Sequence, residues 1–189
     1  MDAGKIRYIG PDGAERVRHF INIAAFGLAG DVAHHIHRAG KKLGGTLSYA
    51  LSSARALLTA RAKPLRLTAD GRDLSGRYHL GVIANTAYMG GGMLVAPQAV
   101  DDDGVMELVL VADMSRLRLW NNFPRLYRGT HLNGRGISLR GIKTLKAESD
   151  ETVYLNIDGE AAGTLPVSFE LLPKAVTVLV PAKAGLPGF

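Results

Sequence analysis

The sequence contains no cysteine, which excludes disulfide bonds and metal sites built from thiolates. No apolar run approaches the ~20 residues that a bilayer-spanning helix needs. The N-terminus lacks the basic stretch and apolar segment of a secretory signal. These absences favour a cytoplasmic protein. With 189 residues, 47% of them hydrophobic and 21% charged, the chain is typical of a globular domain that can bury a core.

Common catalytic motifs are also missing. There is no G-x-x-x-x-G-K-[ST] loop for nucleotide phosphates, no G-x-S-x-G serine nucleophile and no H-E-x-x-H zinc helix. His34, His35 and His37 lie close together in the sequence, and His34 and His37 could share a helix face. Because no carboxylate at matching spacing accompanies them, we interpret them as an exposed helix face rather than a metal site.

Positive charge is concentrated in two tracts. The net charge is +6, and the segments 38–72 and 116–146 each hold eight lysines and arginines. The first segment contains Asp70 as its one acid, and the second contains none. Such tracts could face anionic lipid, nucleotide phosphates or nucleic acid, or they could be solvated faces. Nucleic acid is not favoured, because the aromatic residues do not interleave with the basic ones as stacking platforms would.

Apolar spacing and turn signals predict a mainly β fold, an antiparallel β-sandwich with a few helical insertions. The expected strands are 5–9, 15–23, 65–69, 78–85, 105–111, 137–147, 152–157, 167–172 and 176–180. A helical pattern begins near Gly30, the clearest helix is 46–62, and Ser115 could cap another that bends or restarts at Pro124. We expect one domain over residues 1–183 and a tail over 184–189.

Two acidic segments contain more glycines or carboxylates than a simple turn requires. Residues 90–104, GGGMLVAPQAVDDDG, join three glycines to three aspartates. Consecutive glycines are expected where the backbone takes positive φ or passes close to a partner. Adjacent carboxylates repel one another until a turn, solvent or a cation relieves the repulsion. Asp158-Gly159 is first a hairpin turn, but Glu160 follows it, so two carboxylates could point at one ligand from a strand end.

Three motifs occur in one order along the chain. They are Phe20-Ile21-Asn22-Ile23-Ala24-Ala25-Phe26-Gly27, then Asn85 with glycines 90–92, Ala96-Pro97 and Asp103-Gly104, and finally Asp158-Gly159-Glu160. Together they resemble the C-terminal domain of the diacylglycerol kinase/sphingosine kinase superfamily, in its bacterial lipid-kinase branch. The resemblance covers residues 2–181. It implies transfer of the γ-phosphoryl group of ATP to a lipid hydroxyl, diacylglycerol-like or sphingoid, with magnesium and in a cleft between two domains.

The resemblance also implies a missing partner. The Gly-Gly-Asp-Gly-Thr signature of the family's N-terminal nucleotide-binding domain is absent from this sequence. The chain would then be an excised domain, a truncated reading frame or one half of a split enzyme. We expect it to be inactive without that domain. Its basic tracts would bring it to the inner face of an anionic membrane.

Individual residues receive roles from the same resemblance. Asp158 matches the acid that serves as general base toward the lipid hydroxyl, and Glu160 matches a neighbouring acid linked to the magnesium–water network. Asp103 matches a carboxylate of a structural divalent-metal site. The backbone carbonyls of Val100 and Val105 would be its fellow ligands, a hard-oxygen set that suits Mg²⁺ or Ca²⁺.

Asn22 and Asn85 are expected to be structural polar groups that close loops near the cleft. Two further hypotheses stay open beside the kinase domain. One is a non-catalytic β-sandwich module that binds lipid or a protein partner and uses a structural cation. The other is a basic nucleic-acid-binding module, which predicts steeply salt-dependent binding to DNA.

Overall fold

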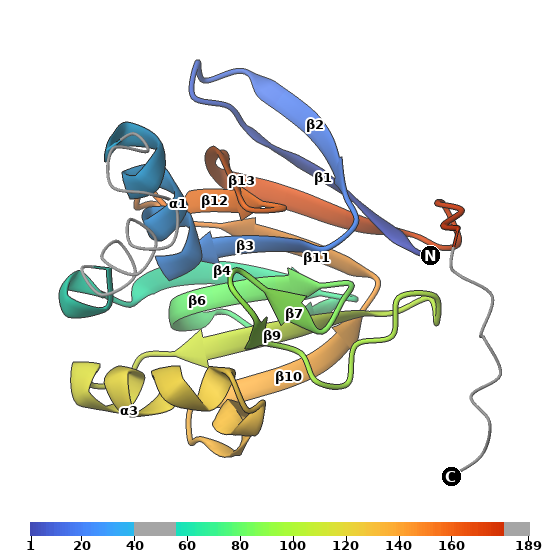
Figure 1. Ribbon diagram of the computed structural model, residues 1–189. Helices are drawn as coiled ribbons and strands as arrows, with labels where there is room; N and C mark the ends of the chain where they lie inside the picture. Colours follow the sequence, from blue (N-terminus) through green and yellow to red (C-terminus); the bar gives the residue numbers. More distant parts are fainter. Residues whose placement is uncertain (40–55, 180–189) are drawn as a thin grey trace, which may run out of the picture.

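The computed structural model describes residues 1–39 and 56–179 (Figure 1). In this part of the chain, eleven strands form one antiparallel sheet and two short strands pair separately. The strands are β1 (Ala3–Ile9), β2 (Glu15–Phe20), β3 (Ile23–Gly27), β4 (Lys63–Ala69), β5 (Arg72–Asp73), β6 (Gly76–Ala84), β7 (Tyr88–Met89), β8 (Met93–Leu94), β9 (Met106–Ala112), β10 (Ile137–Ile142), β11 (Thr144–Glu148), β12 (Tyr154–Ile157) and β13 (Glu160–Leu172). The mainly β prediction is confirmed.

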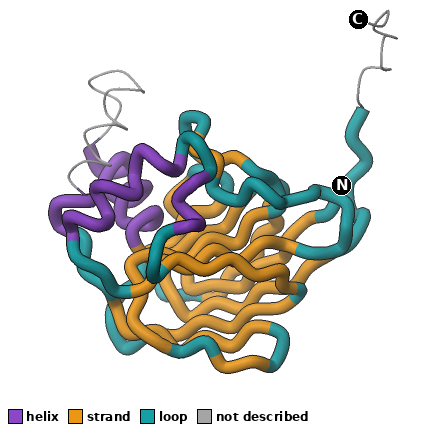
Figure 2. Tube along the Cα trace, turned by 90° about the horizontal axis from the view of Figure 1, so that it is seen from below, coloured by secondary structure: helices purple, strands orange, loops and turns teal. Residues whose placement is uncertain are grey.

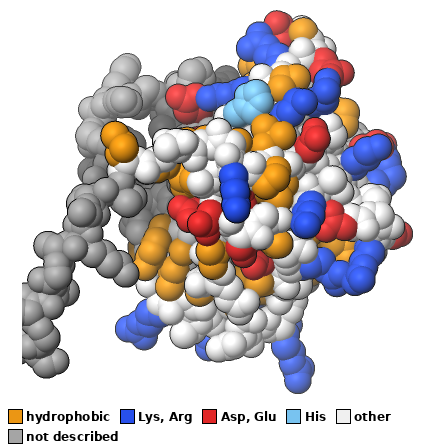
Figure 3. All heavy atoms as spheres, turned by 90° about the vertical axis from the view of Figure 1, so that its right-hand side faces the viewer, with side chains coloured by type: hydrophobic (Ala, Val, Ile, Leu, Met, Phe, Trp, Pro, Cys, Tyr) orange, Lys and Arg blue, Asp and Glu red, His pale blue; other side chains and the backbone are white. Residues whose placement is uncertain are grey.

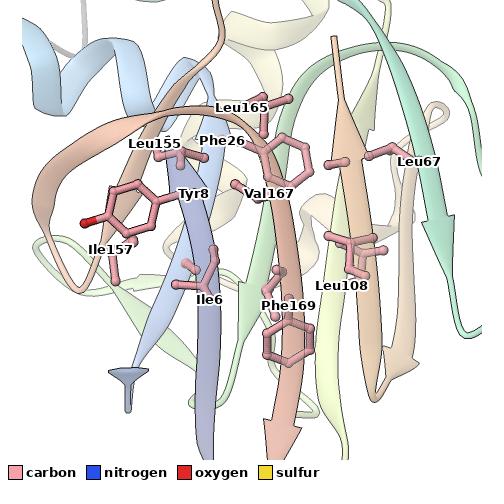
Figure 4. Packing of buried hydrophobic residues seen from close by; sticks show 14 of the residues in the cluster. Ile6, Tyr8, Phe26, Leu67, Leu108, Leu155, Ile157, Leu165, Val167 and Phe169 are labelled. Carbon is pink, nitrogen blue, oxygen red and sulfur yellow. The ribbon is translucent and has the colours of Figure 1, made fainter. Parts of the chain in front are cut away.

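The main sheet closes on itself. Strands β6, β3, β12, β13, β11 and β4 are successive neighbours, and β4 also pairs with β6, so six strands form a ring. Strands β9 and β10 continue the sheet from β6, whereas β1 and β2 extend it from β13. One core lies inside the ring, where Phe26, Leu155 and Val167 pack together (Figure 4).

Strand β4 shows why this sequence forms half-buried strands. Leu65, Leu67 and Ala69 are buried, and Arg66 and Thr68 between them are exposed. This is the period of two that a sheet with one buried face requires. Because burying a leucine contributes about 1.5–3 kcal/mol, a slip of one residue that exposed both leucines would be strongly unfavourable.

The helices α1 (Leu28–Ala39) and α3 (Arg116–Leu126) and the 3-10 helix η1 (Thr130–Asn133) lie at one end of the strands (Figures 1 and 2). As predicted, Ser115 caps α3, and its Oγ accepts a hydrogen bond from the Arg118 amide at 3.4 Å. Pro124 lies inside α3, which continues to Leu126 without restarting. Among the described residues, no helix is long and apolar enough to cross a membrane.

A second apolar cluster lies between these helices and the sheet. Ala25 on β3, Val82 on β6 and Val109 on β9 are buried in it. Ala29 of α1 and Leu126 of α3 pack against the same cluster. The outer face of these three strands is therefore covered by helices, which explains why β3 is buried along its whole length.

Two predicted strands are each split in the structure. The expected strand 15–23 divides into β2 and β3, because the backbone N–H groups of residues 21–23 donate to the Asp158 carboxylate. The expected strand 137–147 divides into β10 and β11 at Lys143, whose backbone N–H donates to Asp70. An amide bound by a side chain is not available to the sheet ladder, so the strand ends there.

Two other expectations fall near the ends of the described segments. The strand expected at 176–180 is wrong for residues 176–179, which form no strand. Instead, Val176 and Met1 exchange two hydrogen bonds, at 3.1 Å and 3.0 Å. Most of the expected helix 46–62 lies outside the described residues. Residues 56–59 are helical, and β4 begins at Lys63.

Candidate functional site

A cavity of about 560 Å³ lies between the helices and the outer face of the sheet. Its walls come from α1, α3, β6, β9 and the hairpin of β7 and β8. Apolar side chains make up most of the wall, among them Val32, Leu80, Met93, Val109 and Leu126. Cavities of this size with apolar walls and a few polar groups are typical of small-molecule and cofactor sites.

The triple-glycine segment forms the turn of the β7–β8 hairpin. Met89 and Met93 pair across this turn, and both line the cavity together with Gly90. The φ angles of glycines 90–92 lie between 22° and 89°. A Cβ on Gly91 or Gly92 would meet no atom within 4 Å, so backbone conformation, rather than lack of space, requires glycine there. The segment that was unusual in the sequence is therefore a rim of the cavity.

Polar groups form one part of the cavity wall. Asn22, Asn156, Asp158 and Gly159 all line it. The Gly159 amide donates to Asn156 Oδ1 at 2.8 Å, which fixes the turn that presents Asp158. An apolar cavity with a carboxylate in its wall can hold an apolar chain and bind a hydroxyl at the end of it.

The Asp158 carboxylate is held by three consecutive backbone amides. Oδ1 accepts hydrogen bonds from Asn22 at 3.1 Å and Ile23 at 2.9 Å, and Oδ2 accepts one from Ile21 at 3.1 Å. The Asp158 amide itself donates to the Ile23 carbonyl at 2.9 Å. Since a carboxylate offers about four lone-pair sites over its two oxygens, Oδ2 keeps a site for one more donor.

The backbone of Asp158 explains how it reaches these amides. Its φ is 49°, in the left-handed region that aspartate tolerates in an Asp-Gly turn, and Gly159 follows at 89°. The turn joins β12 to β13 and brings the carboxylate over the junction of β2 and β3.

Glu160 turns to a different partner. Its Oε2 lies 2.8 Å from Nη2 of Arg18 on β2, and the Glu160 side chain is 70% exposed. The hydrogen bond that Arg18 donates to Glu160 is the main cause that raises the pKa of Arg18. Of the two acids predicted at this strand end, the structure places Asp158 in the wall of the cavity and Glu160 against the β1–β2 hairpin.

Two buried histidines line the cavity, and the sequence analysis missed both. His131 is 1% exposed, and its Nε2 donates to the Val95 carbonyl at 3.1 Å. Burial lowers the pKa of His131, so the ring is neutral and its Nδ1 is an acceptor without a partner. His79 is 5% exposed, with Nε2 3.0 Å from the Met114 carbonyl. Isolated histidines carry no sequence signal that separates buried from surface ones.

The acidic loop is tied to the N-terminus. Asp2 is fully buried, and its carboxylate accepts hydrogen bonds from the backbone N–H groups of Gly104 at 2.8 Å and Lys174 at 2.7 Å. Asp103 Oδ1 accepts a hydrogen bond from the Val105 amide at 3.0 Å, the geometry of a turn before a strand. Val100 is 49% exposed. Asp2 was not predicted as a structural residue.

One observation at this loop fits a cation. Oε2 of Glu107 is buried and has no hydrogen-bond partner. Burial, and after it the negative charge of Asp103, raises the pKa of Glu107. A hard-oxygen set of the Asp103 carboxylate and nearby carbonyls would suit Mg²⁺ or Ca²⁺. Over the described residues, no group of three or more His, Asp or Glu side chains is arranged to hold a metal.

The two asparagines act as predicted. Asn85 is fully buried, and its Nδ2 donates to the carbonyls of Asp2 at 2.9 Å and Ile21 at 2.8 Å. The Asn85 backbone N–H donates to the Asn22 backbone carbonyl at 2.9 Å. The side-chain Oδ1 of Asn22 accepts a hydrogen bond from the Thr86 hydroxyl. Both asparagines therefore fix the loops beside the cavity.

Comparison with known proteins gives a family match. The sequence model of the "YegS C-terminal NAD kinase beta sandwich-like domain" matches residues 22–180. The chain is 27% identical over 164 residues to the diacylglycerol kinase of Bacillus subtilis strain 168, covering 87% of this chain and 54% of that protein. It is 30% identical over 138 residues to the diacylglycerol kinase of Mycobacterium tuberculosis strain H37Rv, covering 72% and 44%. The chain thus spans about half the length of these curated relatives.

Solved structures share the fold. A crystal structure of a candidate diacylglycerol kinase from Bacillus anthracis str. Sterne has a TM-score of 0.65 and 25% sequence identity, covering 91% of this chain and 53% of that one. A second structure with the same assignment has a TM-score of 0.63 and 24% identity. Both likenesses extend over nearly all of this chain.

Proposed function

The chain belongs to the family of the YegS C-terminal NAD kinase β-sandwich-like domain, and we propose that it is the substrate-side domain of an ATP-dependent lipid kinase. The relatives named above are diacylglycerol kinases, and the chain spans about half of their length. One observation carries the proposal: an apolar cavity of about 560 Å³ has Asp158 in its wall. The cavity would hold the acyl part of a diacylglycerol-like or sphingoid lipid, and its hydroxyl would lie beside that carboxylate.

Asp158 would act as the general base. A base must lie within hydrogen-bond reach of the proton that it takes. Oδ2 accepts one backbone N–H, whereas Oδ1 accepts two. Oδ2 is therefore the oxygen that would accept a hydrogen bond from the lipid hydroxyl. The three amides fix the carboxylate in place, so no reorganisation is needed when the hydroxyl arrives. Phosphoryl transfer depends mainly on such positioning and on charge stabilisation.

The remaining parts of the reaction would come from elsewhere. The nucleotide-binding domain would supply ATP, and magnesium would neutralise charge on the transferred phosphoryl group. Glu160 is the acid of this chain proposed to act through the magnesium–water network. In the structure it pairs with Arg18 at 2.8 Å and is largely exposed, so a rotation of its side chain would release it. Asp103, with the carbonyls of Val100 and Val105, would hold the structural cation.

The proposal is tested in two steps. The isolated chain should retain a long-chain diacylglycerol, and fusion to the ATP-binding half of the Bacillus subtilis kinase should restore transfer of phosphate from ATP to that lipid. Lipid retention without transfer would leave a lipid-binding module. Absence of both, with a folded fusion that still binds ATP, would contradict the proposal.

A second candidate function is that non-catalytic module. It is favoured by one observation, because Asp70 makes the same kind of backbone hydrogen bonds as Asp158 but lies away from the cavity. A carboxylate in this arrangement can therefore be purely structural. An activity measurement is therefore needed to distinguish the roles of the two aspartates, because their hydrogen-bond geometry alone does not.

A further inference from the structure

Helix α3 carries an apolar stripe on its outer face. Leu117 is 71% exposed, Trp120 37% and Tyr127 49%, and Pro124 between them is also exposed. These residues follow one another at spacings of three, four and three, so they lie along one side of the helix and its C-cap. An exposed apolar stripe on a helix usually marks an interaction site.

The inner face of the same helix is a wall of the cavity. Leu119, Phe123 and Leu126 line the cavity, and Leu119 is buried. Helix α3 is thus apolar on two sides, one already covered by the domain and one exposed. The outer stripe and the cavity wall therefore lie on neighbouring sides of one helix, and Tyr127 of the stripe contacts Phe123 of the wall edge-on.

Unpaired cations flank the outer stripe. Arg116, Arg118, Arg125 and Arg128 are all exposed, and none of them forms an ion pair within the described residues. No acid occurs anywhere in the sequence between Asp113 and Glu148. Helix α3 therefore presents positive charge that no acid nearby in the sequence offsets.

The opposite end of the molecule differs. There, basic and acidic side chains are interspersed on the surface (Figure 3). Elsewhere on the domain many exposed arginines are paired, as Arg16 is with Asp12 at 2.9 Å and Arg66 with Asp150 at 3.0 Å. Arg72, Arg135 and Arg140 are also exposed and form no ion pair within the described residues, so what distinguishes α3 is the combination of its arginines with an exposed apolar stripe.

We propose that α3 docks onto an anionic lipid bilayer, with Leu117, Trp120 and Tyr127 in the interface and the arginines against the lipid headgroups. Tryptophan and tyrosine favour this interface because their rings are apolar with one polar group. Helices with an apolar face between arginines lie in the plane of the bilayer. A nucleic-acid surface would use the arginines but would leave Leu117 in water.

Docking of α3 would also set the position of the cavity relative to the bilayer. Leu57 and Leu119 share one buried cluster, and the neighbouring Leu58 is 58% exposed, so exposed apolar surface continues beside α3. With α3 in the headgroup region, the cavity, which lies on the side of α3 that faces the domain, would lie just above the headgroups rather than among the acyl chains. This last step rests on the proposed function, whereas membrane binding itself does not.

Trp120 is the only tryptophan of the chain, so its fluorescence reports on α3 alone. Vesicles of phosphatidylglycerol and phosphatidylcholine should shift its emission to the blue and co-sediment the chain, and phosphatidylcholine alone should not. Arg125→Gln should lower partitioning about fivefold, the effect of one surface cation. Leu117→Asp should abolish the shift. Val17→Asp on β2, also at an exposed apolar position, is the matched control and should bind as wild type.

Three results would overturn the docking proposal: no shift with anionic vesicles, a shift that Leu117→Asp leaves intact, or salt-dependent retention on DNA without vesicle binding. Retention of a detergent-solubilised diacylglycerol is measured in parallel. If the lipid is retained and the vesicles are not, the docking surface is wrong and the lipid site stands. If vesicles bind but the solubilised diacylglycerol is not retained, the docking surface stands and the lipid site is wrong.

Discussion

Asp158 and Asp70 make the same hydrogen bonds at two separate turns. Each precedes a glycine and has a left-handed backbone, with φ of 49° and 45°. The Ile23 N–H donates to the Asp158 carboxylate, and the Asp158 N–H donates to the Ile23 carbonyl. Asp70 and Thr144 exchange the same two hydrogen bonds. They differ in their surroundings, since Asp158 lines the cavity and Asp70 does not. The chain thus contains a matched pair, one structural and one proposed to be catalytic.

Replacing each aspartate by asparagine separates the two roles. Both Asp158→Asn and Asp70→Asn should lower the free energy of unfolding, by about 1–2 kcal/mol, because a neutral amide satisfies fewer backbone N–H groups. Only Asp158→Asn should also lower kcat of the fused kinase, by about 10²-fold or more, as expected for a lost general base. Urea denaturation and lipid phosphorylation measure the two effects. Near-normal turnover in Asp158→Asn would show that this aspartate is structural too.

The stability of the domain should depend on pH through Asp70. Burial acts to raise the pKa of Asp70, but hydrogen bonds from Thr144 and Lys143 outweigh it, so the folded pKa lies below the ordinary 3.8. The resulting stabilisation is fully present above the ordinary value and is lost as pH falls through the folded pKa. Between about pH 5 and pH 2, wild type should therefore lose stability more steeply than Asp70→Asn. Parallel urea midpoints over that range would contradict this assignment.

A divalent cation should stabilise the acidic loop. If Asp103 holds Mg²⁺ or Ca²⁺, a concentration 100 times Kd would stabilise the fold by about 2.7 kcal/mol. Thermal unfolding should show a higher Tm in wild type and no shift in Asp103→Asn. Asp102→Asn, an adjacent exposed carboxylate, is the control and should keep the shift. An equal shift in both variants would place the cation elsewhere, and no shift in wild type would remove the site.

The sequence predicted most strands from their apolar spacing and the turn signals between them, and β4 shows the period of two of a half-buried strand. It failed where a distant side chain decided the outcome. Strand 15–23 reads as continuous, but Asp158, more than 130 residues away in sequence, binds the amides that would continue it. Strand 137–147 fails at Lys143 for the same reason, through Asp70. Local periodicity carries no information about such contacts.

The site was predictable only in its polar part. Asp158 and Gly159 are adjacent in sequence and belong to a recognisable motif. The cavity is assembled from α1, α3, β6, β9 and the glycine hairpin, segments that are far apart in the sequence. His131 illustrates the difference, since its burial depends on the Val95 carbonyl 36 residues before it. Without a fold, no pattern identifies such a residue as part of a wall.

The most direct test is to locate the bound lipid. A diacylglycerol with a photoreactive group midway along one acyl chain should label residues of the cavity wall such as Leu80, Met93 and Leu126. Ala29→Phe, which adds a ring to the α1 wall, should reduce that labelling about tenfold, and Val17→Phe on the exposed face of β2 should not. Labelling confined to the outer surface, or unchanged labelling in a folded Ala29→Phe variant, would contradict the assignment of the cavity as the lipid site.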